Sequence, residues 1–407
     1  MSLEALAYAL FLTEAAVCVG ADAVVGLRRP AGAPWHRWAD SLESIAVQAF
    51  TGCVAFFGKL WLILVYGWVL ESASLGLWAG RPVDYVWAFL AYDLLGYVFH
   101  RASHETALGW AVHQVHHQPE EYNITVAMRT APFRSALDWP TILPLAVLGV
   151  PMAWTAVLFV IHIAGQYWLH VRWIGRLDAL GWVVNTPSHH RVHHGCQPGY
   201  QDANYGANLI VWDRLFGTFV PEREAPVYGI AASLPGHSPL RSVFGPFARA
   251  WQRTEGWSPA HRLLAWVRHP GWNPKTQVSS ETTRNTGGHG SDPGFGVAPR
   301  KVEEPCRTLP QALLEVALAN GFLLSAPAWP ALGLPAALLL VHGLVALHRV
   351  GQHLENRPPS MGSERVRAAL MAASAVLFPP WIAAALLGVG LALGLGTLVP
   401  RAPEPAR

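Results

Sequence analysis

Long apolar stretches separated by short polar connections dominate the amino-acid sequence. The hydrocarbon core of a bilayer is about 30 Å thick, so a spanning helix needs roughly 20 mainly apolar residues. Residues 3–27 and 45–70 reach that length, and residues 85–99 form a shorter stretch with Asp93 as its only charge. The pattern predicts three membrane-spanning helices in the first hundred residues.

Prolines interrupt the later apolar stretches. Residues 139–168 contain Pro140, Pro144 and Pro151, and proline inside a helix removes a hydrogen bond and kinks or breaks it. This stretch is therefore predicted to be a broken helix or a tight hairpin. Residues 313–329 and 331–346 predict a second hairpin split by Pro330, and residues 366–399, interrupted at 379–380, predict one span or two. The length criterion gives roughly six to eight membrane segments in all.

Composition supports a membrane protein. Of the 407 residues, 52% are hydrophobic and 14% are charged, against about 25% charged in ordinary soluble domains. A net charge of +3 is too small to indicate a nucleic-acid partner. The four cysteines lie far apart without a CxxC pair, which argues against a disulfide framework or a thiolate metal site: Cys18, Cys53, Cys196 and Cys306.

Basic residues predict the orientation, because they gather in cytosolic loops. Arg28, Arg29 and Arg37 follow the first span, whereas Arg81 stands alone after the second. Residues 171–310 carry about half of the basic side chains of the chain. If these segments share the cytosolic side, the third span ends there, near His100.

Three parts of the chain are expected. Residues 1–270 would form a membrane-embedded catalytic domain, and residues 311–407 would supply accessory transmembrane helices. Residues 271–310 are rich in Ser, Thr, Gly and Pro and predict a flexible linker.

Eight histidines fall in three short boxes next to predicted membrane exits. HRASH has an i, i+4 pair, and HQVHH and HRVHH each place three histidines at i, i+3 and i+4, on one face of a helix. Neutral imidazole is a ligand of Zn, Cu, Fe and Ni, and eight imidazoles suffice for two metals. Burying them without a metal would leave many ring nitrogens in need of partners. The boxes are His100 and His104; His113, His116 and His117; and His190, His193 and His194.

The order HxxxH, HxxHH, HxxHH on a multi-span protein resembles the fatty acid hydroxylase superfamily, which includes sterol desaturases. Over residues 85–230 the chain is most similar to the alkylglycerol monooxygenase branch, through FHRASHE, WAVHQVHHQPEEYN, NTPSHHRVHHG, NYG and WDRLFGTF. The resemblance implies an all-α transmembrane helix bundle with a histidine-rich di-metal cap on the cytosolic face. It makes the eight box histidines metal ligands and adds His170 as a further ligand position. His189, which abuts the third box, is a weaker candidate, and Gln166 stands where some members have a histidine, so the number of ligands at one metal stays open.

The resemblance also implies the chemistry. Two ferrous ions and O2 would hydroxylate an unactivated C–H bond of a membrane lipid, with electrons from an external donor or from a reduced pterin such as tetrahydrobiopterin. In an alkylglycerol, hydroxylation beside the ether oxygen gives a hemiacetal, which collapses to a glycerol derivative and a fatty aldehyde.

Four further side chains are candidates for the site. By the resemblance, Glu105 would serve pterin or metal function, with a plain surface carboxylate as the alternative. Asp213 would accept a hydrogen bond from a ligating imidazole, or instead form a salt bridge with Arg191 or Arg214. Asn123 and Tyr205 would line the site.

Two other functions stay open. A hydroxylase or desaturase of the same superfamily could act on a sterol, a fatty acyl chain or a carotenoid-like chain, because a shared fold and metal site do not determine the substrate. A metal transporter or sensor is the alternative from another class, but its ligands should lie near the bilayer midplane rather than at one interface.

Overall fold

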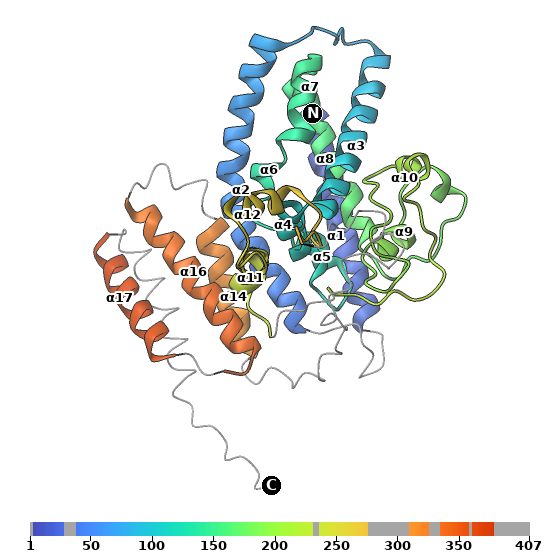
Figure 1. The fold of residues 1–407 in the computed structure, drawn as a ribbon. Helices are drawn as coiled ribbons and strands as arrows, with labels where there is room; N and C mark the ends of the chain where they lie inside the picture. The colour runs from blue at the N-terminus through green and yellow to red at the C-terminus, as the bar shows by residue number, and fades with distance from the viewer. Residues whose placement is uncertain are drawn as a thin grey trace.

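The computed structural model of this protein describes residues 3–27, 38–230, 236–275, 309–324, 334–357 and 360–377 (Figure 1). Within these ranges the regular structure is helical, and the backbone pairing outside helices amounts to an isolated bridge between Val184 and Leu209. The all-α class predicted from the sequence is confirmed.

The apolar stretches near the N-terminus form long helices. Each predicted stretch lies within one helix; α1 has the predicted bounds, whereas α2 and α3 extend beyond their apolar stretches at both ends. Figure 1 shows α7 between α2 and α3. The helices are α1 (Leu3–Leu27), α2 (Trp38–Ala73) and α3 (Pro82–Glu105).

The predicted break in residues 139–168 is confirmed. Helix α7 (Trp139–Leu148) ends at Gly149, whose φ of +89° is a left-handed conformation that glycine adopts without strain. Pro151 then precedes α8 (Met152–Leu169) in an extended conformation. Glycine stops the first helix and proline starts the next.

Two described helices are long and apolar enough to cross a membrane, namely α2 over Ala39–Ala73 and α8 over Met152–Leu169. The second half of α2 also exposes large apolar side chains, including Trp61, Leu64 and Trp68. Exposed apolar surface of this kind is uncommon on a soluble monomer and is typical of lipid or protein contact.

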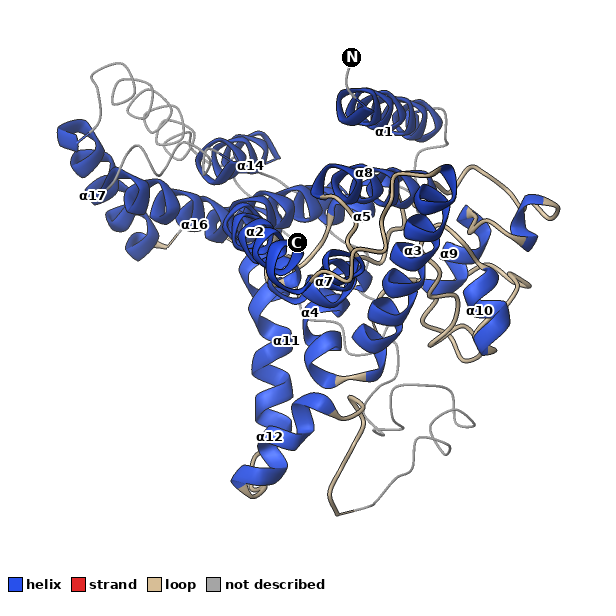
Figure 2. Cartoon of the chain, turned by 90° about the horizontal axis from the view of Figure 1, so that it is seen from above, coloured by secondary structure: helices blue, strands red, loops and turns tan. Residues whose placement is uncertain are grey.

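Shorter helices lie beside these long ones. Figure 2 shows α11 and α12 projecting to one side, while α9 and α10 lie on another. Their bounds are α4 (Ala107–His117), α5 (Ile124–Met128), α6 (Arg134–Leu137), η1 (Leu180–Trp182), α9 (Pro187–His193), α10 (Val211–Phe216), α11 (Pro239–Arg253) and α12 (Pro259–Val267).

The C-terminal helices pack on the first half of the chain. Helices α14 (Leu309–Leu324) and α16 (Leu334–Leu354) lie against each other, and α17 (Met361–Leu377) follows. Buried Ala312 and Leu347 share an apolar core with residues of α2, α4 and α11.

Several predictions lie wholly or partly outside the described residues. These are the basic loop at 28–37, most of the 271–310 linker, the hairpin turn at Pro330 and the chain beyond 377.

Candidate metal centre

All three histidine boxes lie on helices, as predicted. HRASH occupies the last turns of α3, HQVHH the end of α4, and HRVHH helix α9 with its C-cap. His170 is the residue that ends α8. Helix ends therefore present all of these imidazoles.

A sharp reversal brings the first two boxes together. Thr106 ends α3 and begins α4, and its hydroxyl accepts a hydrogen bond from the Gly109 backbone N–H. A Cβ at Gly109 would lie 2.6 Å from Ser103 Cα, so the close approach of the two helices requires glycine there.

Nine of the ten predicted ligands converge in two groups. Within each group, one ring nitrogen per histidine lies within 4.8 Å of the others. The groups adjoin, since the His117 and His194 rings stack with centroids 4.3 Å apart. The first group is His100, His104, His113, His117 and His193, and the second is His116, His170, His190 and His194.

Each HxxHH box contributes to both groups. At 100° per residue, the i and i+4 histidines are about 40° apart around the helix, while the i+3 residue lies about 60° to the other side. The i, i+4 pair of α4 accordingly joins the first group and His116 the second. Helix α9 does the reverse, with His193 in the first group and the pair in the second. This motif suits two adjacent metals.

Backbone carbonyls set the tautomers of four ligands. Nδ1 of His100 donates to the carbonyl of Tyr205 (2.8 Å), and Nδ1 of His116 donates to that of Arg129 (3.1 Å). A carbonyl only accepts, so Nδ1 carries the proton and, in a neutral ring, Nε2 presents a lone pair. The same pattern joins His170 Nδ1 to the Gln166 carbonyl (2.6 Å) and His193 Nδ1 to the Ala203 carbonyl (2.9 Å).

The resulting lone pairs face one another. Nε2 of His116 lies 3.2 Å from Nε2 of His170, and neither atom carries a proton to share. Nε2 of His193 is buried and has no hydrogen-bond partner among the described residues. Imidazole nitrogens about 2.1 Å from a metal at right angles would be about 3.0 Å apart. The donor set and its spacing therefore fit a transition metal in each group.

Burial keeps these imidazoles neutral. It holds the pKa of His113 well below the ordinary 6.5, and the neighbouring histidines lower it further. Burial lowers the pKa of His170 to about 4. Neutral rings are the form that ligates metal. The pKa is likewise well below 6.5 in His100, His116, His117, His190, His193 and His194.

The two groups are unequal. The first contains the i, i+4 pair His100 and His104, whereas the corresponding position of the second is His170 alone, with Gln166 four residues before it. The departure noted in the sequence thus coincides with the smaller group. His189 joins neither group, and its ring packs edge-on against Phe219 instead.

Asp213 and Glu105 have partners other than imidazoles. Buried Asp213 accepts hydrogen bonds from the backbone N–H groups of Tyr205 and Gly206, each at 2.7 Å. It therefore supports the loop whose Tyr205 carbonyl orients His100, and the predicted direct contact with an imidazole is wrong. Glu105 is 45% exposed and pairs with Arg101 at 2.9 Å, the arrangement of a surface carboxylate.

The salt bridges considered for Asp213 do not form either. Arg191 instead makes a bidentate pair with Glu222, at 2.9 and 2.7 Å. The guanidinium of Arg214 lies over the Phe219 ring, 3.8 Å from its centroid.

Tyr205 lines the centre, whereas Asn123 caps a helix. The Tyr205 ring lies 5.2 Å from that of His104, centroid to centroid, and the described residues provide no partner for its buried hydroxyl. Asn123 Oδ1 accepts from the Thr125 backbone N–H at 2.9 Å, and its amide donates to Ser41.

Some supporting residues were not predicted. The four accepting carbonyls have no side-chain signature in the sequence. Asp202 Oδ1 lies 3.6 Å from His104 Nδ1, and fully buried Arg129 lies next to His116. A lone arginine at the end of the apolar segment ITVAMR was a signal for the latter.

An apolar cavity of about 250 Å³ reaches both groups. Its lining includes His113 of the first group and His116 of the second. The remaining wall is mainly apolar and comes from α3, α4, the α6–α7 region and α12, with Phe99, Leu137, Trp139 and Trp266 among its residues and Arg134 as its charged one. The volume is near the lower end of the range for small-molecule sites, which suits one slender apolar chain.

Residues 85–218 match the model of the family described as fatty acid hydroxylase. This matched domain is similar to that family. All nine converging histidines lie within it, so the resemblance predicted from the sequence is confirmed on the segment that carries the site.

Relatives of the domain include alkylglycerol monooxygenases. That of Xenopus tropicalis is 38% identical over 204 residues, covering 50% of this chain and 45% of the relative. That of Homo sapiens is 35% identical over 224 residues, covering 54% and 49%. An ornithine lipid hydroxylase of Rhizobium tropici is 30% identical over 127 residues, covering 30% and 38%. The chain thus spans about half the length of the curated relatives it matches, and no solved structure matches it.

Proposed function

We propose that this protein is a membrane monooxygenase that hydroxylates a lipid C–H bond, with an alkylglycerol ether lipid as its substrate. The apolar cavity reaching His113 and His116 carries this proposal, because it leads a hydrocarbon chain to both groups of ligands. The alkylglycerol monooxygenases among the relatives support the substrate class.

Nine neutral imidazoles would hold two iron ions. When bound, the irons would supply the activation of O2 that insertion of oxygen into an unactivated C–H bond requires. The protein's own contribution is positional. Backbone carbonyls orient the rings, and the apolar wall excludes bulk water and directs one carbon of the chain toward the ligands.

We propose a multi-pass membrane topology with the site at the cytosolic face. The two long apolar helices and the exposed apolar side chains of α2 support it. In this arrangement Phe99 and Trp139, which line the cavity, lie near the bilayer, so an alkyl chain enters sideways while its headgroup stays hydrated. Residues 1–270 would be the catalytic domain, residues 271–310 a flexible linker and residues 311–407 accessory helices.

We propose a reduced pterin, tetrahydrobiopterin, as the electron donor. Glu105 directly follows His104 and is partly exposed, so a soluble cofactor can reach it. Glu105→Gln should then raise the KM for the pterin without changing the iron content.

A sterol or fatty acyl hydroxylase or desaturase, or one acting on a carotenoid-like chain, is the second candidate. Two relatives support this second candidate: the ornithine lipid hydroxylase, and a methylsterol monooxygenase of Aspergillus fumigatus that is 28% identical over 174 residues.

The test is anaerobic purification in mild detergent, followed by metal analysis and O2 uptake with an alkylglycerol plus tetrahydrobiopterin. About two irons per chain with substrate-dependent uptake and release of a fatty aldehyde are expected. Two irons without turnover would move the assignment to the second candidate and to other electron donors. No stoichiometric transition metal would refute the monooxygenase proposal.

A further inference from the structure

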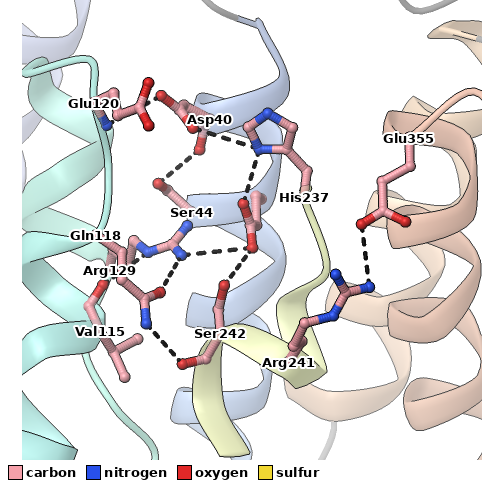
Figure 3. Close-up of polar contacts among 11 residues, drawn as sticks. Asp40, Ser44, Val115, Gln118, Glu120, Arg129, His237, Arg241, Ser242 and Glu355 are labelled. Atoms are coloured by element: carbon pink, nitrogen blue, oxygen red, sulfur yellow. Dashed lines mark hydrogen bonds and ion pairs between the residues drawn. The ribbon is translucent and has the colours of Figure 1, made fainter. Parts of the chain in front are cut away.

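A buried polar cluster adjoins the metal centre without supplying a ligand to it. Figure 3 shows it between α2, the end of α4 and the start of α11. At its centre are Arg129, Glu43 and His237, each less than 5% exposed. Burying charged side chains this deeply costs desolvation free energy unless each charge is paired with an opposite charge or a hydrogen-bond partner.

Arg129 caps the helix that carries HQVHH. In a continuing helix, the Val115 carbonyl would accept from the N–H of residue 119, but that residue is Pro119 and has none. Arg129 Nε donates to this carbonyl instead, at 2.8 Å, and Nη2 donates to Gln118 Oε1, also at 2.8 Å (Figure 3). A cation at a helix C-terminus is also favourable for the helix dipole.

The same residue orients a ligand of the second group. Its carbonyl accepts from His116 Nδ1 at 3.1 Å, which directs the His116 Nε2 lone pair toward His170. The side chain of Arg129 thus fixes the end of α4, and its backbone fixes a ring on that helix. Both contacts fail together if residue 129 moves.

Glu43 balances the Arg129 charge. Glu43 Oε1 lies 3.5 Å from Arg129 Nη2, and the Ser242 hydroxyl donates a hydrogen bond to the same oxygen. His237 Nδ1 lies 3.0 Å from Glu43 Oε2 and 3.4 Å from Asp40 Oδ1. Asp40, Glu43 and His237 are spaced like the ligands of a cation. However, the Glu43 carboxylate already pairs with the Arg129 guanidinium, and the His237 imidazole lies against both Glu43 and Asp40.

We propose that Arg129 is a positioning residue for the metal of the second group, and that Glu43 holds it in place by balancing its charge. The inference rests on the proposed function only in that the second group binds iron. It predicts that loss of either side chain weakens that one iron site while the first group keeps its affinity.

The experiment measures iron binding by the full-length chain in detergent. Apo protein is loaded anaerobically with Fe²⁺, and the affinities of the two sites are resolved by competition with a chelator. Variants are Arg129→Gln, Arg129→Lys and the near-isosteric Glu43→Gln, which keeps most of the volume if the arginine variants do not fold. His116→Ala provides the pattern expected when the second group fails.

Arg349→Gln is the matched control. Arg349 is a fully buried arginine that pairs with Glu315 between α16 and α14, and it contacts none of the nine histidines. Its loss should lower thermal stability but leave both iron affinities at their wild-type values.

Arg129→Gln is expected to weaken one iron site roughly 10- to 100-fold, the usual effect of losing an orienting partner, in the pattern of His116→Ala. Arg129→Lys should recover only part of this affinity, because an ammonium cannot make the two-point contact of the guanidinium fork. Glu43→Gln should weaken the same site.

Equal iron affinities in wild type, Arg129→Gln and Glu43→Gln would overturn the inference. So would parallel weakening of both sites in step with lost stability. Failure of the wild type to oxidise alkylglycerols while it holds two irons would refute only the substrate assignment. If the wild type binds no transition metal, both proposals are refuted.

Discussion

Asp213 offers the sharpest test of how the loop behind His100 supports the metal centre. Its Oδ1 accepts from the Tyr205 backbone N–H and the Thr218 hydroxyl, and its Oδ2 accepts from the Gly206 backbone N–H, all at 2.7 Å. Asp213→Asn can keep an oxygen at the Oδ1 position only by turning its amide N–H₂ toward the Gly206 N–H. Two donors would then face each other in a buried loop.

The magnitude follows from that geometry. A hydrogen bond to a charged acceptor contributes about 1.5–3 kcal/mol, and a buried donor left unsatisfied adds a penalty. We expect the free energy of unfolding to fall by about 3 kcal/mol. Displacement of Gly206 also moves the Tyr205 carbonyl, which accepts from His100 Nδ1, so one iron site should weaken roughly 10- to 100-fold.

The assay pairs thermal unfolding in detergent, followed by tryptophan fluorescence, with chelator competition for iron. Asp84→Asn is the control, because Asp84 is also buried and accepts from the backbone N–H groups of Ala79 and Arg81. It lies at the other end of α3, about 24 Å along the helix from His100. The reasoning is refuted if both variants lose iron equally, or if Asp213→Asn keeps wild-type affinity.

Three further outcomes are expected. In the metal-free chain, burial places the pKa of His170 at about 4, below the ordinary 6.5. Because only the unfolded chain protonates His170 between pH 6.5 and pH 4, the free energy of unfolding should be highest above pH 6.5. It should fall by about 3 kcal/mol toward pH 4 from this residue alone, and a free energy of urea unfolding that does not change with pH would contradict this. Tyr205→Phe should leave iron content and stability nearly unchanged, since its hydroxyl lacks a partner among the described residues; loss of iron would contradict this. Ala102→Trp, at the cavity lining, should raise the KM for alkylglycerols with both irons retained, and unchanged kinetics would remove the cavity from the substrate path.

The sequence alone determined what depends on local periodicity. The i, i+3 and i+4 spacings identified helical faces with eight histidines, and the structure brings all eight together. Long apolar stretches predicted long helices, and the prolines of residues 139–168 predicted the break that the structure has between α7 and α8. These signals lie within one or two turns of chain, where residue type decides the backbone.

Only the tertiary structure decided how the histidines are shared. His116 is one residue from His117, yet the two belong to different groups, because His116 faces His170 at the end of α8 and His117 faces His104 of α3. His189 abuts the third box but packs on Phe219. The Tyr205 carbonyl that orients His100 and the cap that Arg129 supplies to α4 join residues 105 and 14 positions apart in the chain. Such contacts depend on which helix faces meet, and helical periodicity specifies a face without specifying its neighbour.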